Sequence, residues 1–374
     1  MDKIDITAVR TKKDLMRFIK LPWKIYRDDR NWIPPLIMDR KKLLDRKKNP
    51  FFKHAEMEMF LAYKNGELAG RIAGITNENH NKFQDDNAGF FGFFESIDDQ
   101  GVAAALLDRV KEWLKEKGKD GIFGPMNPST NDETGLLIEG FETPPYIMMC
   151  HNPAYYQKLL EEYGLKKAKD LYAWYIDVRN YEIPPRLLEI SEKVKSRYSI
   201  SLRNLRLKDL HNELKLVLEV YNNAWSKNWG FVPMTTEEIL HAANDLKQIA
   251  DEEFLLLAEK DGKPIGFSVT LPNLNEILIN VRNGKLFPTG LFKLLTGMKK
   301  IRNVRVVMLG VVKDFQKAGF GSIFYVETLR RAIARGFHGG EMSWILEDNY
   351  PMNSAIEMFG SKRHKIYRIY QDQL

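Results

Sequence analysis

Six consecutive residues near the C-terminal end, Gln316-Lys317-Ala318-Gly319-Phe320-Gly321, have the composition of a phosphate-binding loop. They follow a run of β-branched residues at 304–312 that is typical of a half-buried strand. They precede apolar residues that recur at helical spacing over 323–333. A glycine turn that enters a helix leaves backbone N–H groups directed outward, and these groups bind anions together with the helix dipole. Gly319 and Gly321 would also let a pyrophosphate approach the backbone closely.

The spelling of this loop excludes the two commonest nucleotide-binding patterns. No Gly-Lys-Ser/Thr follows, as a Walker-type loop requires, and G-x-G-x-x-G is absent. The spelling Q-x-x-G-x-G between a strand and a helix instead resembles the GCN5-related N-acetyltransferases (GNAT), whose loop is usually R/Q-x-x-G-x-G/A. In that family the loop cradles the pyrophosphate of acyl-coenzyme A (acyl-CoA). The plainer interpretation is an ordinary strand-to-helix turn, with glycines that permit close packing.

A second motif lies beyond the helix, where residues 340–349 read as a strand and 350–360 as a helix that closes at a glycine. This order resembles the fifth strand and fourth helix of the GNAT fold, in which the pantetheine arm of acyl-CoA enters a gap between two strands. The resemblance implies that Val311 and Val312 contact the arm and that Asn349 lies near the thioester sulfur. It also implies a set of pyrophosphate-binding residues: Gln316, Lys317, Ala318, Gly319, Phe320 and Gly321.

Acyl transfer from a thioester to an amine needs a base for the amine and an acid for the departing thiolate. Glu347, at the end of the predicted strand, is the first candidate for the base, ahead of Glu341, which begins that strand. GNAT proteins often carry a tyrosine acid seven residues after the position of Asn349, but this chain has Ile356 there. Tyr350 is the candidate substitute. The ordinary alternatives are a solvated carboxylate for Glu347 and simple packing for Tyr350.

An internal repeat organises the whole chain. Asn65-Gly66 and Asp261-Gly262 each separate two apolar runs, as in a β-hairpin, and they lie 196 residues apart (262 − 66). Two further pairs of similar segments occur: Lys-Asp-Leu begins at residues 13 and 208, an offset of 195 (208 − 13), and Asn-Trp ends at residues 32 and 229, an offset of 197 (229 − 32). We therefore predict an α/β (α+β) protein with two tandem GNAT-like domains, residues 1–180 and 181–374. Each domain should contain a mixed, mostly antiparallel sheet with flanking helices.

The repeat also bears on the phosphate-binding loop. Aligning Gly118 with Gly336 places Asp98 and Asp99 of the first copy opposite the loop of the second. Carboxylates beside a pyrophosphate would repel it. We therefore expect the C-terminal copy to bind acyl-CoA and the N-terminal copy to be degenerate in cofactor binding.

Length and composition set broad limits. The 374 residues fit two domains, and a hydrophobic fraction of 44% supplies a sizeable core. A single cysteine, Cys150, excludes an internal disulfide framework and favours a reducing compartment. No window has the length of a membrane span, and the first residues lack the apolar core of a signal peptide. We expect a soluble, cytoplasmic protein.

The formal net charge of +7 suits an anionic ligand, an anionic membrane surface or nucleic acid. The densest basic run, residues 40–53, includes Phe51 and Phe52. It is either a solvated surface or a patch that faces lipid or phosphate, so peripheral membrane contact is one expectation. No recognised nucleic-acid-binding module is present, and we expect no nucleic-acid partner.

Several alternatives stay open at this point. His80 and Asp85 match the weak H-x-x-x-x-D pattern of glycerolipid acyltransferases, and no histidine or cysteine spacing indicates a metal site. The cofactor is acetyl-CoA or a longer acyl-CoA, and the acceptor is a small-molecule or lipid amine, including a sphingoid base. A non-catalytic acyl-CoA-binding protein is the alternative from another class, and a homodimer is compatible with either.

Overall fold

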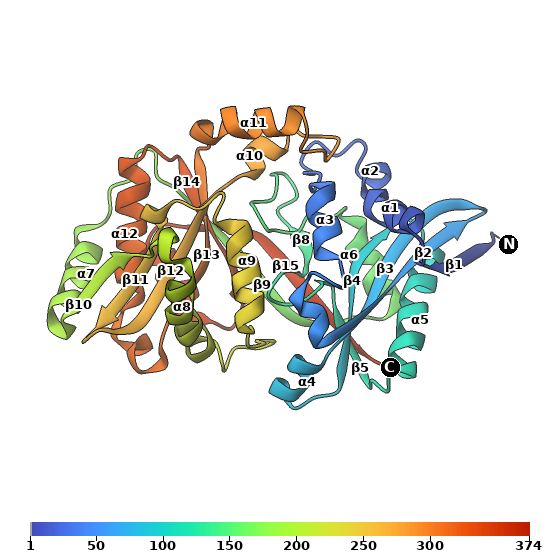
Figure 1. Ribbon diagram of the computed structural model, residues 1–374, viewed down its shortest axis with the longest axis horizontal. Coiled ribbons are helices and arrows are strands. Elements are labelled where there is room, and N and C mark those ends of the chain that lie inside the picture. The colour runs from blue at the N-terminus through green and yellow to red at the C-terminus, as the bar shows by residue number, and fades with distance from the viewer. Residues whose placement is uncertain (1) are drawn as a thin grey trace. The chain divides into compact units, whose positions relative to one another are not determined.

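The computed structural model describes residues 2–374, without the side chains of Lys317 and Ala318, and its chain folds into two compact units (Figure 1). Unit 1 contains the residues up to Leu171 together with Ile277–Leu295 and Lys365–Leu374. Unit 2 contains Tyr172–Glu276 and Thr296–His364. Each unit therefore takes segments from both halves of the sequence. The division at residue 180 stays a prediction about the repeat.

Unit 1 is built on a sheet with the strand order β1-β2-β3-β4-β5-β15, and β8 also pairs with β15. Its strands are β1 (Ile4–Ala8), β2 (Ala55–Lys64), β3 (Glu67–Asn77), β4 (Ala88–Ser96), β5 (Gly121–Gly124), β6 (Met126–Asn127), β7 (Glu133–Thr134), β8 (Leu136–Glu139) and most of β15 (Lys362–Gln373). Its helices are α1 (Lys12–Lys20), α2 (Pro22–Ile25), α3 (Ile37–Leu43), α4 (Glu78–Gln84), α5 (Gln100–Glu116) and α6 (Tyr155–Tyr163).

Unit 2 has the strand order β9-β14-β13-β12-β11-β10. Its strands are β9 (Lys166–Asp177, from Tyr172 on), β10 (Ile200–Asn204), β11 (Leu255–Lys260), β12 (Lys263–Pro272), β13 (Asn303–Val311) and β14 (Gly339–Leu346). Its helices are α7 (Pro185–Tyr198), α8 (Leu210–Ala224), α9 (Thr236–Leu246), α12 (Gly321–Ala334) and α13 (Tyr350–Met358). Two helices, α10 (Asn275–Leu278) and α11 (Thr289–Gly297), lie mainly in the segment that folds with unit 1.

The strand registers confirm the tandem repeat. Ile4 pairs with Lys64 in unit 1, and Ile200 pairs with Lys260 in unit 2, at an offset of 196 on both strands. The hairpins that follow turn at the predicted Asn-Gly and Asp-Gly pairs, where all four residues have positive φ, as a type I′ turn requires. Both hairpins carry a register shift after the corresponding alanine, Ala62 or Ala258. The predicted mixed, mostly antiparallel sheet with flanking helices is confirmed.

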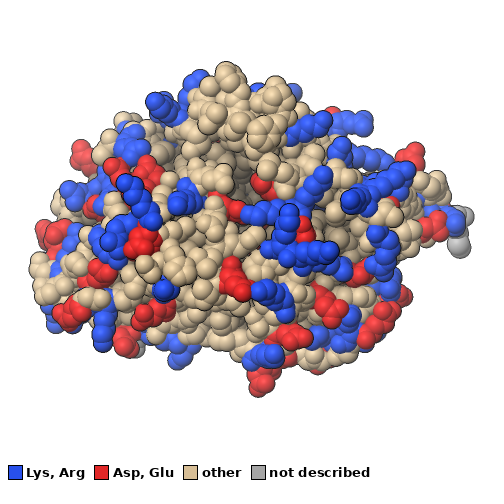
Figure 2. Space-filling model, in the orientation of Figure 1, with Lys and Arg blue, Asp and Glu red and all other residues tan. Residues whose placement is uncertain are grey.

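No helix in the described part of the chain is both long and apolar enough to span a membrane. On the face of the molecule in Figure 2, basic and acidic side chains are interspersed among uncharged residues.

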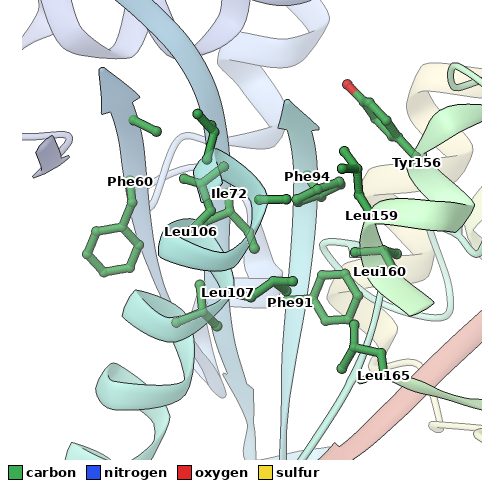
Figure 3. Packing of buried hydrophobic residues seen from close by; sticks show 14 of the residues in the cluster. Phe60, Ile72, Phe91, Phe94, Leu106, Leu107, Tyr156, Leu159, Leu160 and Leu165 are labelled. Atoms are coloured by element: carbon green, nitrogen blue, oxygen red, sulfur yellow. The ribbon is translucent and has the colours of Figure 1, made fainter. Parts of the chain in front are cut away.

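The core of unit 1 forms where α5 lies on its sheet (Figure 3). Leu106, Leu107 and Val110 recur at helical spacing and are fully buried against strand residues such as Ile72 and Phe91. Truncation of such a leucine to alanine typically costs about 2–5 kcal/mol. This packing fixes the position of the α5 N-terminus, just as a second apolar cluster fixes α12 in unit 2.

Each unit contains one parallel strand pair, β4–β5 or β13–β14, and the helix α5 or α12 connects its two strands. The carboxyl ends of parallel strands meet at one edge of a sheet. The loop that enters each connecting helix therefore lies at that edge, where α/β folds place their ligand sites.

Candidate active site

The loop between β13 and α12 turns on Gly319. Residues Lys313–Ala318 form a 3₁₀ turn, and Gly319 then adopts a φ of +75°, which favours glycine. The N-cap residue of α12 is Phe320, whose side chain has no atom that can accept a hydrogen bond. No side chain therefore caps this fourteen-residue helix, although the Ser322 and Ile323 N–H groups donate to the Gly319 and Phe320 oxygens. A helix N-terminus of this kind is a candidate anion site.

The two glycines leave room for a ligand beside the backbone. A Cβ atom on Gly319 would have its nearest neighbour 3.9 Å away, at Ile190 Cγ2. A Cβ atom on Gly321 would meet Tyr325 Cε2 at 3.4 Å, an ordinary contact. Neither glycine is tightly enclosed by neighbouring atoms, which is a condition for a ligand to approach the backbone here.

Gln316 holds the loop in place from the inside. Its Nε2 donates to the backbone oxygens of Ala224 (3.1 Å) and Val311 (2.9 Å). The predicted contacts of Lys317 and Ala318 concern side chains outside the described residues.

A gap opens between β13 and β14 beside this loop. The strands pair from Asn303–Gly339 to Val306–Met342, and among the described residues their pairing ends there. Both strands nevertheless continue, to Val311 and Leu346. On the other side, β13 carries a bulge at Val307 against β12. The pairing of β13 with β14 therefore ends next to the bulge, on the side of the loop.

The side chains of Val311 and Val312 belong to the apolar core, where Val311 is 7% exposed. The Val312 N–H donates to Ile265 O at 2.9 Å. If these two residues contact a ligand in the gap, they would do so through backbone atoms other than the Val312 N–H, and not through their side chains.

A mainly apolar cavity of about 40 Å³ lies on one face of the two strands, at the inner end of the gap. Its walls include Val306 of β13 and Met342 of β14, with Tyr325 and Leu329 from α12 and Ile356 from α13. Burial raises the pKa of the Tyr325 hydroxyl above its usual range.

Charged residues lie on the opposite face of the same two strands. Arg305 and Glu341, which are register partners, alternate with the cavity residues and are both at most 1% exposed. Ser343 Oγ donates to Glu341 Oε1 at 2.6 Å and accepts from Arg305 Nε at 3.0 Å. His364 Nε2 lies 2.9 Å from Glu341 Oε2. We call Arg305, Glu341, Ser343 and His364 the buried network.

The buried network presents one titratable side chain to solvent. The His364 side chain is 21% exposed, whereas Glu341 is completely buried beneath it. The guanidinium of Arg305 lies 3.8 Å from Glu341 and offsets its charge, and it stacks over the Trp344 ring. A buried carboxylate that orients an accessible imidazole is the usual arrangement of a histidine general base.

The comparisons with known proteins agree with this geometry. A scan against family models finds no match. Two curated relatives are each 37% identical: protein YghO of Escherichia coli K12, with 97% of this chain and 94% of the relative covered, and the bacterial ceramide synthase of Caulobacter vibrioides, with 99% and 98% covered. The chain belongs to their family.

Solved structures show which fold the chain has. A tandem GNAT protein from the clavulanic acid biosynthesis pathway matches with a TM-score of 0.58 and 11% identity, over 99% of this chain and 98% of its own. A GCN5-related glucosamine N-acetyltransferase region of a fungal multi-domain protein matches with a TM-score of 0.59 and 14% identity, over 100% of this chain and 38% of the longer one. The chain has the tandem GNAT fold.

The GNAT loop predicted from sequence lies at the helix N-terminus described above, whereas the predicted catalytic residues lie at the outer end of β14. Glu347 is half-buried in the turn that follows the strand, and Tyr350 is 73% exposed. Asn349 caps α13, because its Oδ1 accepts from the Met352 N–H at 3.3 Å. Glu341 and Glu347 are six residues, or about 20 Å, apart along the chain.

Sequence reasoning missed His364 and ranked Glu341 below Glu347. One signal was available, since Glu341 is the charged residue in the otherwise uncharged strand Gly-Gly-Glu-Met-Ser-Trp-Ile-Leu. A carboxylate in a buried strand is expensive unless it is paired. His364 gave no comparable signal, because it lies in a basic run and reaches Glu341 only through the fold.

In unit 1 the chain itself occupies two places that unit 2 leaves open: the N-terminus of the connecting helix and the gap beside the first strand of the parallel pair. Asp99 caps α5, where its side chain accepts from the Val102 N–H at 3.0 Å and pairs with Lys64. Only residues 97–98 separate β4 from this cap, against 312–319 in unit 2. Gly101 therefore lies in the first turn of α5, not opposite Gly319 as the sequence alignment placed it.

The gap beside β4 is filled by the chain itself. A Cβ atom on Gly92 would lie 1.7 Å from the Met126 backbone oxygen, so β6 lies directly against β4. Asn127 Oδ1 accepts from the Phe93 N–H in the same place. No comparable opening remains for a pantetheine arm at this point of unit 1.

The H-x-x-x-x-D pattern does not form a dyad as written. His80 is buried and its Nε2 lies 3.2 Å from Asp86, while Asp85 ends α4 in a left-handed conformation. Burial lowers the pKa of His80. Among the described residues, no group of three or more histidine, cysteine or acidic side chains is arranged to hold a metal ion.

Proposed function

We propose that the chain transfers a long acyl group from acyl-CoA to the amine of a sphingoid-type base, forming an amide. The observation that carries this proposal is the 37% identity to a bacterial ceramide synthase over 98% of that protein. Protein YghO is equally similar, and its name states no substrate. Acetylation of a small hydrophilic amine, the other expectation from sequence, becomes an outcome of the test.

The C-terminal unit supplies the acyl-CoA site in this proposal. The uncapped N-terminus of α12 and the space beside Gly319 and Gly321 suit the diphosphate. The gap between β13 and β14 suits the pantetheine arm, which would bring the thioester to the bulge at Val307. The apolar cavity beside Val306 and Met342 offers surface for the first carbons of an acyl chain.

The chemical step is a direct attack of the amine on the thioester carbonyl. The new C–N bond forms as the C–S bond breaks, the amine gives up a proton, and the departing thiolate takes one up. We propose that His364 accepts the amine proton, with Glu341 holding the imidazole and stabilising its charge. Glu347 as base and Tyr350 as acid remain the rival assignment from sequence, and Asn349 remains the proposed neighbour of the sulfur.

A product assay tests both whether the chain transfers an acyl group and which acyl donor and amine it uses. The purified chain is supplied with acetyl-CoA or palmitoyl-CoA and either a sphingoid base or a short hydrophilic amine, and amide and free CoA thiol are measured. We expect amide only with palmitoyl-CoA and the sphingoid base. Turnover confined to acetyl-CoA or to the hydrophilic amine would overturn the substrate assignment.

Two glutamine variants then separate the rival bases. His364→Gln should lower kcat by about 10²- to 10⁴-fold, as loss of a general base does. Glu347→Gln should leave kcat within a few-fold of the wild type. The reverse pattern would return the base to Glu347.

A further inference from the structure

Exposed apolar side chains concentrate on one short segment. Phe287, Phe292 and Leu295 are 65%, 69% and 70% exposed, and they are three of the eight large apolar residues that the described chain leaves exposed. All three fall within the nine residues 287–295, which include most of α11. Single exposed apolar residues are common on proteins, but a cluster of this kind marks an interaction surface.

The same segment is strongly basic. Residues 277–313 contain no aspartate or glutamate. The stretch from Ile277 to Arg302 carries six cationic residues: Arg282, Lys285, Lys293, Lys299, Lys300 and Arg302. Figure 2 shows uncharged atoms over α11 with blue side chains at the edges of that area. Apolar tips bordered by cations are typical of a surface that binds anionic lipid.

The apolar tip rests on a fixed base. The Arg282 guanidinium donates to the backbone oxygens of Trp32 (2.8 Å) and Arg30 (2.9 Å), and Trp23 Nε1 donates to Arg282 O at 2.8 Å. Gly284 has a φ of +62°, and a Cβ atom there would lie 2.5 Å from the Trp23 ring. The exposure of the tip is therefore a property of the folded state.

We propose that residues 277–295, which fold with unit 1, dock the protein on an anionic bilayer, with Phe287, Phe292 and Leu295 inserted at the headgroup level. The exposed lysines of this segment, Lys285 and Lys293, contact the lipid phosphates. The choice of a bilayer over a protein partner rests on the charge, because a segment without acidic residues complements a uniformly anionic surface. The proposal does not depend on acyl chain length or on the amine acceptor.

The basic run predicted from sequence as the lipid-facing patch is a weaker candidate. Phe51 is only 4% exposed, and Arg40 forms an ion pair with Glu133 at 2.6 Å. The membrane contact expected from sequence is thus reassigned from residues 40–53 to the α11 segment.

Vesicle co-sedimentation of the full chain tests the proposal. Vesicles of phosphatidylcholine alone are compared with vesicles of equal parts phosphatidylcholine and phosphatidylglycerol. We expect binding to the anionic vesicles that weakens as salt is raised, and little binding to the neutral ones. Failure of the wild type to bind anionic vesicles would overturn the proposal.

Two double variants assign the binding to this segment. Phe292→Ser with Leu295→Ser, and Lys285→Glu with Lys293→Glu, should each lower the bound fraction roughly tenfold at unchanged melting temperature. Met358→Ser, which alters a residue 60% exposed on α13, is the matched control and should bind normally. Wild-type binding by both double variants would overturn the proposal. So would a dimer in solution that the Phe292/Leu295 variant abolishes, because the tip would then be a protein interface.

Discussion

Helix α5 of unit 1 and helix α12 of unit 2 follow corresponding strands, but their N-termini are satisfied in opposite ways. In unit 1 the Asp99 carboxylate occupies the position where a phosphate would bind. In unit 2 the loop is longer and ends in Gly319 and Phe320, which place no carboxylate there. The same helix dipole can therefore hold the protein's own anion or a ligand, and a change of one loop decides which.

The units also differ in how they pair histidine with a carboxylate. In unit 1 His151 lies 2.7 Å from Asp29, and its side chain is 4% exposed while that of Asp29 is 31% exposed. In unit 2 the carboxylate is the buried partner: Glu341 is fully buried, and the His364 side chain is 21% exposed. Only the second arrangement exposes part of the imidazole to solvent, and for this reason we propose His364 rather than His151 as the base.

The largest difference in kcat should appear when each of these two histidines is replaced by glutamine and the two variants are compared. We expect His364→Gln to lower kcat by about 10²- to 10⁴-fold with little change in KM for acyl-CoA. His151→Gln is the matched variant in unit 1 and should retain kcat. Steady-state kinetics on both variants checks this, and a larger loss in His151→Gln would reverse the roles assigned to the two units.

A smaller effect, on the affinity for CoA, is expected from a substitution at Gly321, where the ligand would touch the backbone. Gly321→Leu keeps a helix-compatible conformation but fills the space beside the α12 N-terminus. Loss of one or two charge-assisted hydrogen bonds should weaken CoA binding by about 10- to 100-fold. Gly101→Ala, in the first turn of α5, should leave it unchanged. Calorimetric dissociation constants decide the point, and equal binding by Gly321→Leu would contradict the site.

The smallest effect concerns the cap of unit 1. The Lys64 side chain, and then the Val102 N–H, hold the pKa of Asp99 below its usual range. A carboxyl whose pKa is depressed by folding stabilises the fold above its unfolded pKa, about 3.9, and this contribution is lost as the pH falls through the folded pKa. Asp99→Ala should therefore lower the free energy of unfolding by about 1 kcal/mol at neutral pH.

Urea unfolding at several pH values measures that difference. The difference between the wild type and Asp99→Ala should be constant above about pH 4 and should shrink as the pH falls further, through the folded pKa of Asp99. Asp98→Ala, at the neighbouring position, should match the wild type throughout. A difference that persists in acid would mean that the side chain of Asp99 acts other than through its charge.

Local patterns predicted much of this structure. Asn65-Gly66 and Asp261-Gly262 predicted the two hairpins, because few residues accept positive φ. The Q-x-x-G-x-G loop predicted the turn into α12, and the anion site there stays a prediction. Both signals lie within a few residues of the features that they specify. The spacing between the hairpins then revealed the repeat.

The features that sequence did not predict depend on distant contacts. His364 meets Glu341 across 23 residues, and segment 277–295 folds with unit 1 although it lies among residues of unit 2. The filling of the unit 1 gap by Met126 depends likewise on where a long loop returns. Such contacts are set by packing, which no periodicity in the sequence records.

The stoichiometry of CoA binding tests the central claim most directly. Titration of the full chain with CoA, followed by calorimetry, should give one site per chain that Gly321→Leu weakens and Asp99→Ala leaves intact. Two sites per chain, or a single site that survives in Gly321→Leu, would contradict the assignment of acyl-CoA to unit 2 alone.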